Sequence, residues 1–239
     1  MISFASRFFI LTLLVVGSEA IGNEVTEKKL NLRSSSEGEA KALLKEGSSF
    51  TPVGGGIEVD LDKGLVRMPI ELVGKGNEKD PSRSLGLEFL VTIGMDKDYE
   101  SMFSSKARGQ NLHMALLMIG LEPSKAAKEV PASANLQIEI QIGEERRLAK
   151  DWLLWSNGKS VDDLDWYFRG SELTKVGERT EYAADQALNL VATLPSSSMV
   201  VGPAVDVGNP YNQEDVYLVP ALLPERSLGA QGWIWFQAR

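Results

Sequence analysis

The chain is organised around SLGLEFLVTIGMDKDYESMFSSKARGQNLHMALLMIGLEP, which is Ser84–Pro123. Apolar residues alternate through Leu87–Ile93, and this pattern predicts a strand with one buried face. Leu112–Ile119 then predicts a helix that is apolar almost all round, and such a helix packs on most of its surface. Gly120 suits the end of that helix, and Pro123 prevents much continuation.

Further strands are predicted outward from this stretch. In Leu136–Ile142 (LQIEIQI) the apolar residues share one face and the polar residues share the other, which favours an antiparallel sheet covered on one side. The other predicted strands are residues 57–59, 65–68, 70–73, 164–168, 187–194, 216–219 and 233–236. The fold class expected is therefore α+β, a largely antiparallel sheet of short strands packed with one main buried helix at about 108–120.

The first twenty residues have the features of a signal peptide. Arg7 precedes the apolar run Phe8–Val16, which is shorter than the roughly 20 residues of a membrane-spanning helix. Ser18-Glu19-Ala20 is a small-x-small site, so we expect cleavage near Ala20 and a periplasmic or extracellular protein. The alternative is an uncleaved N-terminal anchor. We expect a polar linker or N-terminal arm over residues 21–50 and a single domain over 51–239.

Composition restricts the classes of partner. The net charge of −8 argues against a nucleic-acid partner, because phosphates are met by basic patches. The chain has no cysteine, so disulfides, thiolate metal sites and lipid attachment at a cysteine are excluded. After signal cleavage, no later segment is long and apolar enough for stable membrane insertion. No cofactor motif is present, so no cofactor is expected.

Few residues have the chemistry for catalysis. His113 is the single histidine, and its ordinary pKa lies near neutrality. We consider it a candidate catalytic residue together with Glu100 and Ser101, if all three share a cleft. The competing interpretation is a core histidine that is hydrogen-bonded to the backbone. One histidine without cysteines disfavours zinc.

Aromatic residues give a second set of candidates. Trp152 and Trp166 lie near acidic residues, and such clusters stack on sugars or peptides as well as filling cores. In Trp233–Phe236, alternation places apolar residues on both faces, so this strand is either central in a sheet or touches a partner.

Several short motifs occur together in one order. They are DYESMF (Asp98–Phe103), NLHMALLMIGLEP (Asn111–Pro123), Asp151-Trp152, WYFRGSEL (Trp166–Leu173) and Tyr182-Ala183-Ala184-Asp185. In this order they resemble the YdjY domain, a bacterial family of exported proteins of unknown function, over about residues 55–239. The resemblance adds Asp185 to the candidate binding residues. Where that family usually has His-Glu-Ser, this chain has Tyr99 before Glu100, so a site built on two histidines is in doubt here.

Two functions remain open from the sequence. The first is a non-enzymatic binding or structural module of the bacterial cell envelope, with an envelope protein or a polysaccharide as its partner. The alternative is a metal-dependent or hydrolase-like enzyme centred on Glu100 and His113. A cleft that joins these two residues would favour the enzyme.

Overall fold

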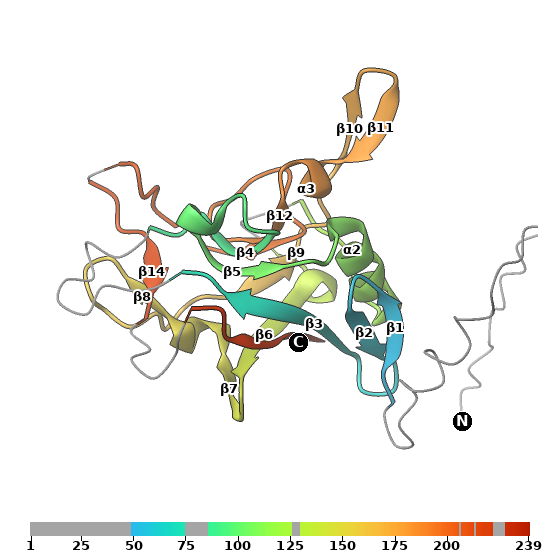
Figure 1. Ribbon diagram of the computed structural model, residues 1–239, viewed down its shortest axis with the longest axis horizontal. Helices are drawn as coiled ribbons and strands as arrows, with labels where there is room; N and C mark the ends of the chain where they lie inside the picture. The colour runs from blue at the N-terminus through green and yellow to red at the C-terminus, as the bar shows by residue number, and fades with distance from the viewer. Residues whose placement is uncertain (1–48, 75–85, 126–129, 206, 213, 222–227) are drawn as a thin grey trace, which may run out of the picture. The chain divides into compact units, whose positions relative to one another are not determined.

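The computed structural model describes residues 49–74, 86–125, 130–205, 207–212, 214–221 and 228–239 (Figure 1). The predicted signal peptide, its cleavage site and all but the last two residues of the predicted linker lie outside these residues. The first described strand, β1, begins at Thr51. No helix among the described residues is long and apolar enough to cross a membrane.

The central feature is a closed ring of eight strands in the order β3-β15-β6-β9-β13-β12-β4-β5, with β5 returning to β3. The strands are β3 (Leu65–Leu72), β4 (Phe89–Ile93), β5 (Ser101–Ser105), β6 (Asn135–Ile142), β9 (Trp166–Phe168), β12 (Asn189–Ala192), β13 (Val201–Pro203) and β15 (Gln231–Ala238). Neighbours run antiparallel except for the pairs β4–β5 and β12–β13. The pairing of β3 with β5 at Glu71–Ser104 and Leu72–Phe103 closes the barrel.

The expected α+β class is therefore wrong. Strands form 42% of the structure and helical segments 14%, so the fold is mostly β. The main predicted helix is present as α2 (Gly109–Met118), inside the expected range of 108–120. However, Met114, Leu117 and Met118 are 54%, 41% and 40% exposed, so α2 is not buried all round. The helix α2 lies beside β1 and β2 (Figure 1). The apolar face of the sheet is covered mainly by the sheet itself, because the sheet closes into a barrel.

The remaining strands either extend the barrel sheet or form two separate two-stranded sheets. β1 (Thr51–Gly54) and β2 (Ile57–Asp60) continue the sheet from β3, and β7 (Glu145–Leu148) pairs with β6. β8 (Leu153–Trp155) pairs with β14 (Leu218–Pro220), and β10 (Leu173–Val176) pairs with β11 (Arg179–Tyr182). The helical segments besides α2 are α3 (Ala183–Gln186) and the single turns η2 (Asp98–Glu100), η3 (Ala132–Ala134) and η4 (Ala149–Trp152).

The core fills the barrel because period-2 alternation sends every second side chain inward. In β6, residues 136, 138, 140 and 142 are buried, and the polar residues between them are partly exposed, as predicted. β15 is central, paired with β3 and β6 over seven positions each. Its Ile234 and Phe236 point inward and are fully buried, whereas Trp233 and Trp235 lie on the outside.

The outward tryptophans are covered by cations. The guanidinium of Arg67 lies 4.6 Å from the ring centre of Trp233, and that of Arg146 lies 4.0 Å from the ring centre of Trp235. Such cation–π contacts allow aromatic rings to remain at a polar surface. The two tryptophans on the outer face of β15 are thus covered, at least in part, by cations of the same chain.

Candidate functional site

His113 lies at the junction of α2 and α3. Its Nδ1 is 2.9 Å from the carbonyl oxygen of Gly170 and 2.7 Å from the hydroxyl of Tyr182, which donates to the same carbonyl at 2.7 Å. The imidazole ring packs edge-on against Phe168 and Tyr182. Burial lowers the pKa of His113, because an apolar environment disfavours its charged form. The imidazole is therefore held by a backbone carbonyl and a tyrosine hydroxyl, and no carboxylate of the described residues bonds to it.

Asp185 lies close to this histidine and has a structural task. Its Oδ1 accepts a hydrogen bond of 2.6 Å from the backbone N–H of Gly109, the first residue of α2. Its side chain is only 5% exposed, and Arg108 approaches it at 3.7 Å. A carboxylate at a helix N-terminus satisfies a free N–H and opposes the positive end of the helix dipole. Asp185 thus caps α2 from α3.

Ser171 connects α3 to the segment that contains Ser198. Its hydroxyl accepts from the N–H of Ala184 in the first turn of α3 and donates to the carbonyl of Ser198. Its backbone lies in the left-handed region at φ 50°, which is uncommon for serine. Both hydrogen-bonding roles of the hydroxyl are filled, so Ser171 holds the chain rather than presenting a nucleophile.

Glu100 and Ser101 lie at the start of β5, whereas the end of β5 leads toward α2 and His113. Glu100 is 7% exposed, accepts from the hydroxyl of Tyr211 at 3.2 Å and lies 3.7 Å from the ammonium of Lys97. The hydroxyl of Ser101 donates to the carbonyl of Lys97 at 2.5 Å. Burial, and then the charge of Glu100, raises the pKa of the neighbouring Glu88. This is a cluster of two carboxyl groups, Glu88 and Glu100, with Lys97 and the two tyrosines Tyr99 and Tyr211.

The structure does not bring Glu100 and His113 together. Glu100 directly precedes β5, whereas His113 follows it in α2. Five strand residues between them span about 17 Å at 3.3 Å per residue. The two side chains also have entirely different hydrogen-bond partners. Among the described residues, no three His, Asp or Glu side chains converge as a metal site would require.

The two tryptophans predicted as binding residues lie in the core. Trp152 and Trp166 are 1% and 3% exposed, and Trp152 packs edge-on against Phe103. A ring buried to this extent offers no face on which a sugar or peptide can stack. Trp233, in contrast, is an outward-facing aromatic residue that borders a surface hollow.

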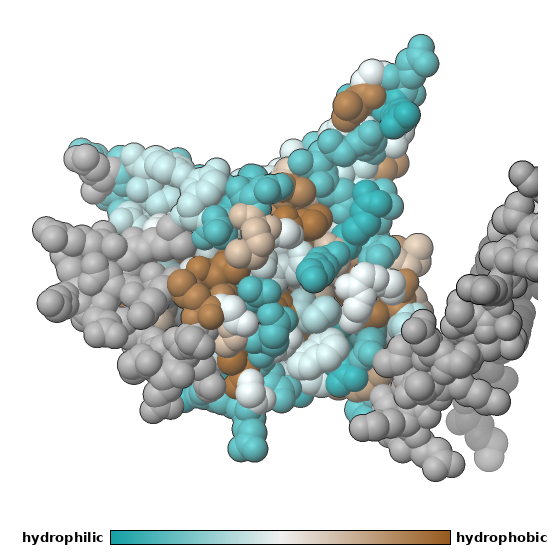
Figure 2. All heavy atoms as spheres, viewed as in Figure 1, coloured by the Kyte–Doolittle hydropathy of each residue, from teal (hydrophilic) through white to brown (hydrophobic). Residues whose placement is uncertain are grey.

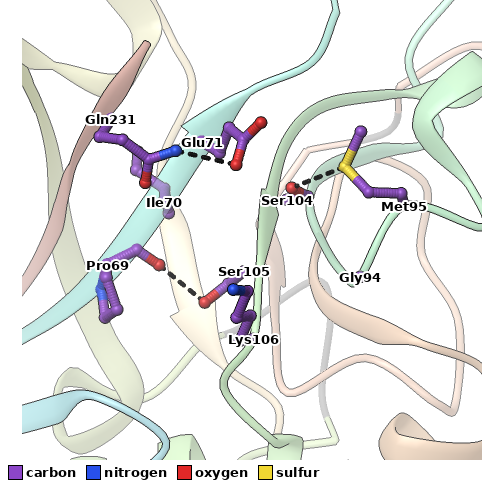
Figure 3. Close-up of a pocket in the computed structure, with 9 residues that line it drawn as sticks. All are labelled: Pro69, Ile70, Glu71, Gly94, Met95, Ser104, Ser105, Lys106 and Gln231. Atoms are coloured by element: carbon purple, nitrogen blue, oxygen red, sulfur yellow. Dashed lines mark hydrogen bonds between the residues drawn. The ribbon is translucent and has the colours of Figure 1, made fainter. Parts of the chain in front are cut away.

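A hollow of about 390 Å³ lies on the outside of the barrel between β3, β5 and β15 (Figure 3). Its lining residues are Pro69, Ile70, Glu71, Gly94, Met95, Ser104, Ser105, Lys106 and Gln231. A second hollow of about 360 Å³ is lined by Pro69, Gln141, Gly143, Gln231, Gly232 and Trp233. The two share Pro69 and Gln231 as a common wall, and we call them together the β3–β15 groove.

Pro69 explains why the groove opens here. β2 pairs with β3 only as far as Arg67, and β5 pairs with β3 only from Glu71 onward. Pro69 lies in the gap and has no N–H with which to continue a ladder. Its carbonyl instead accepts a hydrogen bond of 2.7 Å from the hydroxyl of Ser105. The outer edge of β3 is therefore without a partner strand at this point, and a hollow results.

The groove combines several kinds of polar group. The amide of Gln231 donates to the carboxylate of Glu71 at 2.8 Å, and the two lie side by side in Figure 3. Across β5, the hydroxyl of Ser104 lies 3.3 Å from the sulfur of Met95. Within the described part of the chain, the exposed ammonium of Lys106 has neither an ion pair nor a hydrogen bond. The groove therefore offers hydrogen-bond donors and acceptors, one free cation and an indole edge.

Sequence reasoning missed this groove. Glu71 and Gln231 are 160 residues apart, and no local pattern joins them. Two signals in the sequence could have pointed to it. The first is Pro69, which lies inside an otherwise continuous strand pattern, because proline in a strand marks an edge or an opening. The outward tryptophan of the terminal strand was the other signal.

In comparisons with known proteins, no family model, no curated protein and no solved structure matches this chain. The resemblance to the YdjY domain therefore remains a prediction.

Proposed function

We propose that this chain is an exported, non-enzymatic binding module of the bacterial cell envelope, and that it binds a polysaccharide in the β3–β15 groove. The observation that carries the proposal is the composition of the groove. Sugar hydroxyls both donate and accept hydrogen bonds, and sugar rings have apolar faces. Glu71, Gln141 and Gln231 supply acceptors and donors, and Trp233, which also contacts the guanidinium of Arg67, borders the groove with its indole.

The shape of the groove also supports an extended ligand. Two open hollows that share a wall suit consecutive units of a chain better than one small enclosed molecule. The N-terminal sequence, with Arg7, the apolar run Phe8–Val16 and a small-x-small site at Ala20, supports export. Export would place the groove where envelope polysaccharides occur.

The enzyme alternative has less support. It requires Glu100 and His113 in one cleft, and about 17 Å of strand lies between them. The partners of His113 are a backbone carbonyl and a tyrosine hydroxyl. Without a carboxylate partner among the described residues, His113 lacks the arrangement of a general base that a third group orients.

Affinity electrophoresis in gels that contain soluble envelope polysaccharides tests the proposal, with calorimetry on each polysaccharide that retards the protein. We expect Trp233→Ala and Glu71→Gln each to weaken binding at least about tenfold, or about 1.4 kcal/mol. Matched controls are Tyr211→Ala, an exposed aromatic outside the groove, and Glu178→Gln in the β10–β11 turn; both should bind as the unchanged protein does. Retardation by no polysaccharide, or by one whose binding both groove variants retain, would refute the proposal.

A further inference from the structure

The hairpin β10–β11 projects from the rest of the described chain as a two-stranded arm (Figure 1). Its strands pair only with each other, from Leu173–Tyr182 to Val176–Arg179. Leu173 and Val176 are 70% and 49% exposed, and Figure 2 shows hydrophobic atoms among hydrophilic ones along the arm. An isolated two-stranded hairpin is only marginally stable in water, and a free strand edge is a template for pairing with another strand.

The turn fixes which backbone groups point outward. Only two residues join the strands, and Gly177 has φ 63°, as the first position of a type II′ turn requires. The pair Val176–Arg179 that flanks such a turn is hydrogen-bonded, and bonded pairs alternate with non-bonded pairs. The N–H of Ala183 bonds to the carbonyl of Glu172 at 2.8 Å, in the same alternation. The N–H and C=O of Thr180 therefore point away from β10.

We propose that the outer edge of β11 pairs with β11 of a second copy of this chain. In a symmetric antiparallel pair centred on Thr180, the two Thr180 residues exchange both backbone hydrogen bonds. The same register places Arg179 of each copy opposite Glu181 of the other, on one face of the joint sheet. Opposite charges at directly opposed positions stabilise a strand pair. The edge is thus complementary to itself in both hydrogen bonds and charge.

The side chains on this edge are available for the contact. Arg179 and Thr180 are exposed, and within the described residues Arg179 has no ion pair. The amide of Gln186 donates to the carboxylate of Glu181, which still has lone pairs for a guanidinium. The opposite edge of the hairpin is less suitable, because Lys175 would meet Lys175 of the second copy and like charges repel.

The contact is small, with four strand residues per copy against the roughly 20–30 residues per side of a stable interface. The dimer is therefore weak and depends on protein concentration. Sedimentation equilibrium of the purified chain from about 10 μM to about 1 mM should show reversible dimerisation. Amide NMR shifts that depend on concentration should be largest at residues 179–181.

Substitutions test the register. Arg179→Glu and Glu181→Arg each place like charges opposite one another, so each should weaken the dimer at least tenfold, and the double charge swap should restore it. Thr180→Pro removes an outward N–H without breaking a bond to β10 and should abolish pairing. Lys175→Glu, on the other edge, is the matched control and should leave it unchanged. Thermal melts of every variant verify that the fold is kept. A monomer at every concentration, or a dimer that is indifferent to the Arg179 and Glu181 reversals, would overturn the proposal.

Discussion

The close approach of α2 and α3 at Gly109 gives a sharp test of the structure. A Cβ added to Gly109 would lie 2.8 Å from the Cβ of Ala184, 3.1 Å from Cε1 of Tyr182 and 3.3 Å from Oδ1 of Asp185. Carbon atoms in ordinary contact are about 3.5–4.0 Å apart. Neither the methyl group of Ala184 nor the ring of Tyr182 can rotate away, because both are buried.

We therefore expect Gly109→Ala to destabilise the protein by about 2 kcal/mol. Overpacking a well-filled contact costs about 1–3 kcal/mol. The usual gain of up to about 1 kcal/mol from replacing glycine by alanine in a helix is small here, because Gly109 is the first helical residue. For a domain of this size the loss corresponds to a fall in melting temperature of roughly 4–8 °C. Urea denaturation followed by tryptophan fluorescence measures it.

A double-mutant cycle isolates the cause. Ala184→Gly alone should also destabilise, through a lost methyl group and a helical glycine, but it removes the nearest clashing atom. The double variant Gly109→Ala/Ala184→Gly should then lose about 1 kcal/mol less stability than the sum of the losses of the two single variants. Gln110→Ala, at an exposed neighbouring position, is the control and should lie within about 0.5 kcal/mol of the unchanged protein. Additive losses, or an unchanged stability of Gly109→Ala, would refute the reasoning.

Three further outcomes follow from the same contacts. Because burial lowers the pKa of His113 in the folded protein, the unfolded chain binds a proton at this histidine more readily. The free energy of unfolding should therefore fall as the pH drops below about 6.5, and it should fall less in His113→Asn. Urea titrations at several pH values measure this difference. Asp185→Ala removes the cap of α2 and should cost about 1–2 kcal/mol, whereas Asp185→Asn keeps an acceptor oxygen and should cost less; equal losses would contradict capping by hydrogen bonding. Trp166→Ala, inside the barrel, should cost about 3–5 kcal/mol in the same assay, and Trp233→Ala, on the groove, should cost clearly less; the reverse order would contradict the assignment of inner and outer faces.

The capped helix also gives a physical meaning to two of the short motifs. The segment with His113 and the segment that ends at Asp185 meet at Gly109, where a hydrogen bond and a missing side chain allow the two helices to touch. Gly170, in a third motif, accepts from Tyr182 and contacts His113. These residues act as fold determinants in the described structure, so their presence together does not require a shared chemistry.

Local patterns in the sequence determined the individual elements. Alternation identified residues 136–142 as a strand with one buried face, and the helix was placed within two residues of α2. The two apolar faces of Trp233–Phe236 indicated a strand that is either central or touches a partner, and β15 is central. These predictions succeed because side-chain period and turn residues act over a few positions, where a single sequence carries enough information.

Closure of the sheet was decided only by the tertiary structure. Alternation with period 2 is the same in an open sheet and in a barrel, so no local pattern distinguishes a helix-covered sheet from one that covers itself. The pairing of β3 with β5 closes the barrel, and the hydrogen bond between Gln231 and Glu71 lies in the wall of the groove. Both contacts join segments that are far apart in the chain. The sequence by itself therefore determined which residues of strands such as β6 face inward. The long-range pairing of strands decided which face of α2 is covered, where the surface is hollowed and which polar side chains meet there.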